Sequence, residues 1–156
     1  MLRFLSRLST VFMAISGLSI VTIIVMSITD ALTEAITGRG LAISYDVVEI
    51  AMAYTIFLGL PEVFLRNANI RVDVSDYFLP RRVTRVLEVT GTLLILGFVM
   101  LLLAAMVMPA YDSTRFGDYK YETGFPYWGI WLPIFAGLIA AIPSALAAGG
   151  RKHVEP

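Results

Sequence analysis

The sequence predicts an all-α integral membrane protein with four transmembrane helices, forming a single membrane domain over residues 1–156 with both termini in the cytoplasm. The first observation is composition, because 58% of the residues are hydrophobic and 15% are charged, whereas a soluble domain is about 45–50% apolar and about 25% charged. The second is that four apolar stretches are each long enough for a helix to cross a hydrocarbon core of about 30 Å. The third is the one-sided distribution of lysine and arginine.

The first predicted span covers about residues 8–29, which carry no formal charge. Arg3 and Arg7 precede it, as basic residues precede the apolar core of a signal peptide. The apolar stretch is longer than the usual signal core of about 7–15 residues, and no A-x-A cleavage site follows it. We therefore expect a retained membrane helix.

The second predicted span covers about residues 47–65 and contains two carboxylates, Glu49 near its start and Glu62 near its end. A carboxylate at the centre of a membrane helix costs roughly 2.5–3.5 kcal/mol, but each of these lies within about one turn of an interface. Their positions therefore permit a span. Pro61 lies in its last turn.

The third and fourth predicted spans cover about residues 89–111 and 126–148, and neither contains a charged residue. Trp128 and Trp131 lie near the start of the fourth span, behind a connection rich in tyrosine. Such aromatic residues are enriched where a membrane helix meets water. We expect them to form an aromatic belt at the outer interface.

The orientation follows from the basic residues, because translocating them across the membrane is disfavoured. The expected cytoplasmic side holds nine of the twelve basic residues, which are Arg3, Arg7, Arg66, Arg71, Arg81, Arg82, Arg85, Arg151 and Lys152. The other side has Arg39, Arg115 and Lys120. Both termini are thus expected in the cytoplasm, which requires an even number of spans.

The connection between the second and third spans predicts an amphipathic helix at about residues 70–79, lying in the cytoplasmic interface. Its apolar residues Ile70, Val74, Tyr77 and Phe78 follow the i, i+4, i+7, i+8 spacing of a helix. Alternation within residues 70–74 also suits a strand, but a lone strand at a membrane surface has no partner. We expect the following arginines to lie near acidic lipid headgroups.

The residue inventory argues against direct catalysis and against a bound cofactor or metal ion. The chain has no cysteine, and its one histidine, His153, lies in the polar tail. No clustered metal ligands, nucleophile with its base, phosphate-binding glycine loop or pair of membrane histidines for haem is present. A formal net charge of zero gives no indication of a nucleic-acid partner. The sequence therefore predicts a protein that is not an enzyme.

The two carboxylates of the second span are the candidate ionisable groups at membrane depth, and such groups are functional candidates. Glu62 lies thirteen positions after Glu49, which places the two carboxylates about 140° apart around a helix, so one ion site cannot use both. Glu62 precedes Arg66 by four residues, a favourable pairing distance. We favour structural or partner-facing roles over ion coordination for both carboxylates.

The last span carries a stripe of small residues at spacing four, formed by Gly137, Ala141, Ala145 and Gly149. Small residues let a second helix approach closely in a membrane. The stripe predicts a helix contact, which could lie within this chain or with another protein.

Several segments together resemble a known family of membrane subunits. They are EIAMAY at residues 49–54, FLGLPE at 57–62, Arg66, IRVD at 70–73, LPRR at 79–82 and TGFPYWGIWLP at 123–133. This set is similar to the small membrane (Q-type) subunit of tripartite ATP-independent periplasmic (TRAP) transporters. The family often has a histidine just before the Ile-x-Val-Asp element, where this chain has Asn69.

The resemblance implies an accessory subunit in the bacterial inner membrane, with two partners. One is a large membrane subunit that moves the substrate, and the other is a periplasmic substrate-binding protein that delivers it. Such transporters import organic acids with a sodium gradient. The small subunit is then expected to brace the large subunit and to help dock the binding protein through its outward loops, while the substrate is selected elsewhere.

The resemblance also implies roles for individual residues. Glu49, Tyr54 and Arg66 would be packing or partner contacts, and Asp73, Arg81 and Arg82 would orient the interfacial helix. Two other functions fit four spans. A self-sufficient small exporter would require a carboxylate in mid-membrane on an early helix, and an anchor subunit of a redox complex would require paired membrane histidines. The sequence has neither.

Overall fold

The computed structural model describes residues 2–66 and 81–151, which form four α-helices. The helices are α1 (Leu2–Thr37), α2 (Ala42–Leu65), α4 (Arg81–Arg115) and α5 (Tyr127–Arg151). Each is long and apolar enough to cross a membrane. The predicted all-α membrane architecture is therefore confirmed. The predicted interfacial helix at residues 70–79 lies outside the described residues.

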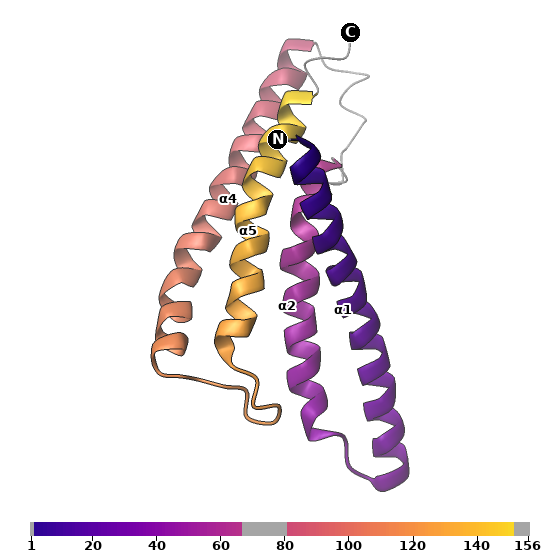
Figure 1. Ribbon diagram of the computed structural model, residues 1–156. Helices are drawn as coiled ribbons and strands as arrows, with labels where there is room; N and C mark the ends of the chain where they lie inside the picture. Colours follow the sequence, from indigo (N-terminus) through magenta and orange to yellow (C-terminus); the bar gives the residue numbers. More distant parts are fainter. Residues whose placement is uncertain (1, 67–80, 152–156) are drawn as a thin grey trace.

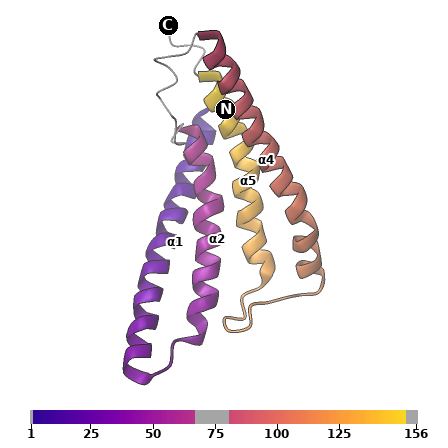
Figure 2. The same ribbon diagram turned by 180° about the vertical axis from the view of Figure 1, so that it is seen from behind.

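The four helices lie side by side in one layer, in the spatial order α4, α5, α2, α1 (Figures 1 and 2). Among the described helices, α4 packs against α5 only, while α1 packs mainly against α2. We call the end with the two short connections the loop end and the opposite end, where α1 begins and α5 ends, the terminal end (Figure 1). The start of the first described helix and the end of the last one lie on the same side, which agrees with an even number of crossings. Which side is cytoplasmic stays a prediction from the charges.

The helices extend beyond the apolar stretches that the sequence marks out. Helix α1 continues eight residues past position 29 to Thr37, because a charge such as Asp30 ends an apolar run without ending a helix. Gly38, with a φ of 71°, terminates it, since glycine adopts this left-handed conformation at little cost. The first connection is thus residues 38–41, and not the longer segment between the predicted spans.

Helix α4 likewise passes through Pro109 and ends at Arg115. At 35 residues it measures about 52 Å, well beyond a hydrocarbon core of about 30 Å. The second described connection is therefore residues 116–126, which we call the loop-end hairpin. The boundaries of the membrane-embedded parts within these helices stay predictions.

Helices α2 and α5 cross so closely that only glycine fits at one position. A Cβ atom added to Gly137 of α5 would lie 2.1 Å from the carbonyl oxygen of Phe57 in α2. Ala141 and Ala145 of the predicted small-residue stripe are also buried. The neighbour of Gly137, which the sequence left open, is therefore a helix of the same chain.

A small apolar core lies where α5 packs against its neighbours. It consists of Val99 from α4 with Ile130, Ile134 and Leu138 from α5. The outer faces of α1 and α4 instead expose many large apolar side chains. Such a surface suits lipid, because apolar side chains at membrane depth need not be removed from water.

Candidate functional site

The loop-end hairpin is held in shape by backbone hydrogen bonds between its own residues, in addition to its contacts with α2. The backbone N–H of Lys120 donates to the carbonyl of Phe125 at 2.8 Å, and that of Gly124 donates to the carbonyl of Lys120 at 2.8 Å. Tyr119 and Pro126 form an isolated antiparallel bridge. Gly124 permits the turn with a φ of 66°. The segment is therefore a defined turn and not an open loop.

Asp46, near the start of α2, attaches the tip of this hairpin. Its buried carboxylate accepts hydrogen bonds from the backbone N–H of Glu122 at 3.0 Å, from that of Thr123 at 3.1 Å and from the Thr123 hydroxyl at 3.2 Å. Hydrogen bonds to a charged acceptor are stronger than neutral ones. One carboxylate therefore joins segments more than seventy residues apart in sequence.

Lys120 forms the second attachment, and the residue is only 7% exposed. Its Nζ lies 2.5 Å from Oε2 of Glu49, one turn along α2 from Asp46, and 5.2 Å from the centre of the Tyr127 ring. Burial by itself lowers the pKa of Lys120, but the hydrogen bond and charge of Glu49, with a smaller contribution from Tyr127, outweigh burial and raise this pKa. The lysine is therefore held in its charged form.

We expect the attachment through Lys120 to persist at neutral pH and to weaken only above the ordinary lysine value of 10.5. A raised pKa means that the ion pair stabilises the folded state fully below the unfolded-state pKa, and that this contribution is lost as the pH rises through the folded-state pKa. Cleavage of the hairpin by subtilisin should therefore accelerate only as the pH rises above 10.5. In the Lys120→Arg protein it should not, because arginine stays protonated. Equal acceleration in both proteins would contradict this role.

Two aromatic side chains tie α5 to its neighbours below the hairpin. The Tyr54 hydroxyl of α2 donates to the carbonyl of Gly129 at 2.7 Å. Trp131 Nε1 of α5 donates to the Ser113 hydroxyl of α4 at 2.8 Å. Trp128 is exposed, as a residue of an aromatic belt would be. Tyr54 and Trp131 thus hold three helices together at the loop end.

At the terminal end, the buried carboxylate of Glu62 forms an ion pair with Nε of Arg66, four residues on. The predicted pairing distance therefore corresponds to a real contact. Glu49 and Glu62 belong to separate pairs at opposite ends of α2. Among the described residues there is no group of three or more histidine or carboxylate side chains that could hold a metal ion.

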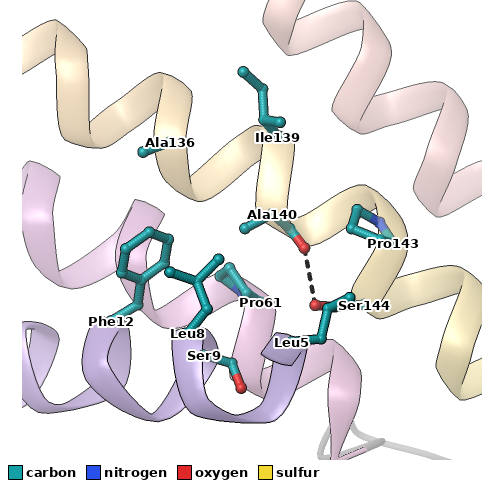
Figure 3. Close-up of a pocket in the computed structure, with 10 residues that line it drawn as sticks. All are labelled: Leu5, Leu8, Ser9, Phe12, Pro61, Ala136, Ile139, Ala140, Pro143 and Ser144. Atoms are coloured by element: carbon teal, nitrogen blue, oxygen red, sulfur yellow. Dashed lines mark hydrogen bonds between the residues drawn. The ribbon is translucent and has the colours of Figure 1, made fainter. Parts of the chain in front are cut away.

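A pocket of about 300 Å³ lies between α1, α2 and α5 near the terminal end (Figure 3). Ser9 and Ser144 are the polar side chains among the residues that line it. Both hydroxyls donate to carbonyls of their own helices, Ser9 to Ser6 at 3.1 Å and Ser144 to Ala140 at 2.8 Å. The lining therefore presents no charged group to a solute.

The structure brings only some of the sequence-predicted residues together. Glu49, Tyr54 and Trp131 belong to the attachments at the loop end, while Glu62 and Arg66 pair at the other end of α2. Asp73 lies outside the described residues. Arg81 and Arg82 are the first two residues of α4.

Asp46 and Lys120 are site residues that the sequence pattern alone does not reveal. One signal for Asp46 was available, because it lies three residues before Glu49 and so shares its helix face. Lys120 had a weaker signal as the single lysine of an otherwise aromatic and acidic connection. Their pairing partners could not be read from the sequence, because both contacts join distant segments.

Comparison with known proteins gives one family. The family model described as tripartite ATP-independent periplasmic transporters, DctQ component, matches residues 23–148. The matched segment contains α2, α4, most of α5 and both attachments of the hairpin. Neither the curated proteins nor the solved structures gave a match.

Proposed function

The chain belongs to the DctQ family of tripartite ATP-independent periplasmic transporters, and from this we propose that it braces the large membrane subunit of such a transporter and helps to dock the periplasmic binding protein. The family is one of transporter components, and the chain is a multi-pass membrane protein. We further propose that the complete transporter imports organic acids with a sodium gradient.

The observation that carries the bracing role is the distribution of charge along the membrane-spanning helices. The charged residues of α2 that form ion pairs lie towards its two ends, with Glu49 paired to Lys120 and Glu62 paired to Arg66. The two carboxylates lie about 20 Å apart along the helix, and the twelve residues between them carry no charged side chain. A solute anion or a sodium ion would find no charged partner there, so transport would require another subunit.

The single-layer arrangement supports the same role. A transporter that encloses its own substrate needs polar groups around a cavity, whereas these helices lie side by side (Figure 1) and the pocket between α1, α2 and α5 is lined mostly by apolar residues. All four described helices expose large apolar side chains. Such a layer can extend the membrane surface of a larger subunit while its own packing stays unchanged.

The loop-end hairpin is the proposed docking surface. With the termini in the cytoplasm, as the basic residues predict, the loop end faces the periplasm. Phe116, Tyr119 and Tyr121 are exposed there, and large aromatic side chains are frequent energetic centres of protein interfaces. The attachments through Asp46 and Lys120 would hold these rings in place before the binding protein arrives.

The test is purification in mild detergent together with the products of neighbouring reading frames. We expect a large polytopic membrane protein to co-purify with the tagged chain, and we expect solute uptake in vesicles only when both membrane subunits and the binding protein are present. Uptake driven by this chain alone would contradict the accessory role.

Replacing Tyr119 and Tyr121 together with serine should separate docking from assembly. Loss of interface aromatic contacts worth roughly 2 kcal/mol or more should reduce uptake by over tenfold at low binding-protein concentration. Co-purification with the large subunit should stay unchanged, because both rings are exposed. The matched control is Tyr45→Ser, an exposed tyrosine on α2 outside the hairpin. Unaltered uptake in the double variant would remove the docking proposal.

A further inference from the structure

The two middle helices of the layer each contain an interior proline close to their partner, Pro61 in α2 and Pro133 in α5. Proline has no backbone N–H, so the carbonyl four residues earlier loses its usual helical donor, and the proline ring crowds that carbonyl and tilts it outward. The affected carbonyls are those of Phe57 and Gly129. Inside a membrane protein no water replaces the lost donor, so another part of the protein must supply a contact.

The carbonyl freed by Pro133 receives a hydrogen bond from the other helix. The hydroxyl of Tyr54 in α2 donates to the carbonyl oxygen of Gly129 at 2.7 Å. Gly129 is buried, and a buried tyrosine hydroxyl usually takes a hydrogen-bond partner. One hydrogen bond therefore satisfies the tyrosine hydroxyl together with a carbonyl to which position 133 offers no N–H.

The carbonyl freed by Pro61 faces a glycine of the other helix. A Cβ atom added to Gly137 would lie 2.1 Å from the carbonyl oxygen of Phe57. In glycine a Cα–H bond points in this direction, and because a Cα–Cβ bond is about 1.5 Å long, the Cα and the oxygen are at most about 3.6 Å apart. A Cα–H group at such a distance is a weak donor to a carbonyl. Gly137 therefore supplies a contact in place of the one that Pro61 removes.

The two contacts are reciprocal, because each helix supplies the group that the other lacks. They also bring together three of the segments that carry the family resemblance. These segments are EIAMAY with Tyr54, FLGLPE with Pro61, and TGFPYWGIWLP with Gly129 and Pro133. No spacing rule links them, since Gly129 lies 75 positions after Tyr54. The crossing of α2 and α5 gives the three segments a joint structural role.

We propose that Tyr54 and Gly137 are the replacement partners of the carbonyls freed by Pro133 and Pro61, so that α2 and α5 form an obligatory pair in the membrane. Each helix keeps a carbonyl without its donor until the other helix is in place. The pairing positions the start of α5, and with it the loop-end hairpin that leads directly into this helix. The inference requires only that both helices lie in lipid, and it is independent of the proposed transport function.

The first test is a double-mutant cycle between Tyr54 and Pro133, measured by reversible unfolding of the full-length chain in mixed micelles of detergent and SDS. Tyr54→Phe removes only the hydroxyl and should raise the unfolding equilibrium constant about threefold to tenfold. In the Pro133→Ala background the N–H of residue 133 reaches the Gly129 carbonyl, so the same change should have an effect of less than about twofold. Equal effects in the two backgrounds would overturn the assignment of Tyr54.

Two controls separate this pairing from general effects of the substitutions. Tyr45→Phe alters an exposed tyrosine of the same helix and should leave unfolding unchanged in both backgrounds. Pro109→Ala removes an interior proline of α4 and should not reduce the effect of Tyr54→Phe. If Pro109→Ala rescued the Tyr54→Phe protein as fully as Pro133→Ala does, the specific pairing of Tyr54 with Pro133 would be contradicted.

The second test is a cycle between Pro61 and Gly137. In the Pro61→Ala protein the Phe57 carbonyl can turn towards the new N–H of residue 61 and away from α5. The rise in the unfolding constant caused by Gly137→Ala should therefore be smaller in this background, by at least about threefold. Equal effects in the two backgrounds would refute the role of Pro61. If Gly137→Ala alone does not fold, recovery of folding by the added Pro61→Ala change is the expected result, and its failure would count against the proposal.

Discussion

Replacing Gly137 with alanine should force α5 away from α2 and destabilise the whole helix layer. The new Cβ would lie 2.1 Å from the carbonyl oxygen and 2.6 Å from the carbonyl carbon of Phe57. These are backbone atoms, so no side-chain rotation relieves the contact and one helix must shift. Overpacking typically costs about 1–3 kcal/mol, and we expect the upper end of this range. The measurement is thermal unfolding of the purified protein in detergent.

The matched control is Gly97→Ala in α4. A Cβ there would have no atom within 4 Å, so the same chemical change should be neutral or slightly stabilising, because alanine restricts the unfolded chain more than glycine does. The two variants should therefore differ in sign. A Gly137→Ala protein as stable as Gly97→Ala would show that α2 and α5 do not cross at this distance.

The second large effect is expected for Asp46→Ala at the loop end. This change removes the acceptor for two backbone N–H groups, of Glu122 and Thr123, and for the Thr123 hydroxyl. A buried donor left without an acceptor costs roughly 1–3 kcal/mol, so we expect a loss of about 2–4 kcal/mol. The hairpin should also open locally, and trypsin should then cleave after Lys120, whose side chain is buried in the intact protein.

Asp46→Asn is the informative comparison, because its amide oxygen still accepts hydrogen bonds while the charge is lost. We expect it to retain most of the protection against trypsin and to lose less stability than Asp46→Ala. In proteoliposomes, cleavage should occur only from the side that the loop end faces, which also tests the predicted orientation. If trypsin cleaved the Asp46→Ala protein no faster than the unaltered protein, the proposed role of Asp46 would be contradicted.

The sequence predicts those contacts of the candidate site that join residues close together along the chain. Glu62 and Arg66 lie one turn apart on α2, so their pairing follows from helix geometry alone. The partner of Glu49 is Lys120, seventy-one residues away, and the partners of Asp46 lie in the same hairpin. No spacing rule links these positions. They meet because α5 places the hairpin over the start of α2.

Helix ends show a similar division. Apolar runs indicate where lipid can surround the chain, but the helices continue into polar sequence, as α1 does beyond Asp30 to Thr37. The position at which a helix ends is therefore set by backbone hydrogen bonding and not by hydrophobicity. In that extension the hydroxyls of Thr33 and Thr37 each donate to the carbonyl four residues earlier, so these polar side chains are satisfied within the helix.

The sequence by itself determined that the chain has four membrane helices, because bilayer thickness sets the length of an apolar run and an isolated run in lipid must satisfy its backbone groups as a helix. Only the tertiary structure decided the order α4, α5, α2, α1 and the attachments of the loop-end hairpin. In lipid, apolar side chains gain little by choosing one another over lipid chains, so helix order depends on close backbone contacts such as that at Gly137 and on a few polar contacts between distant segments.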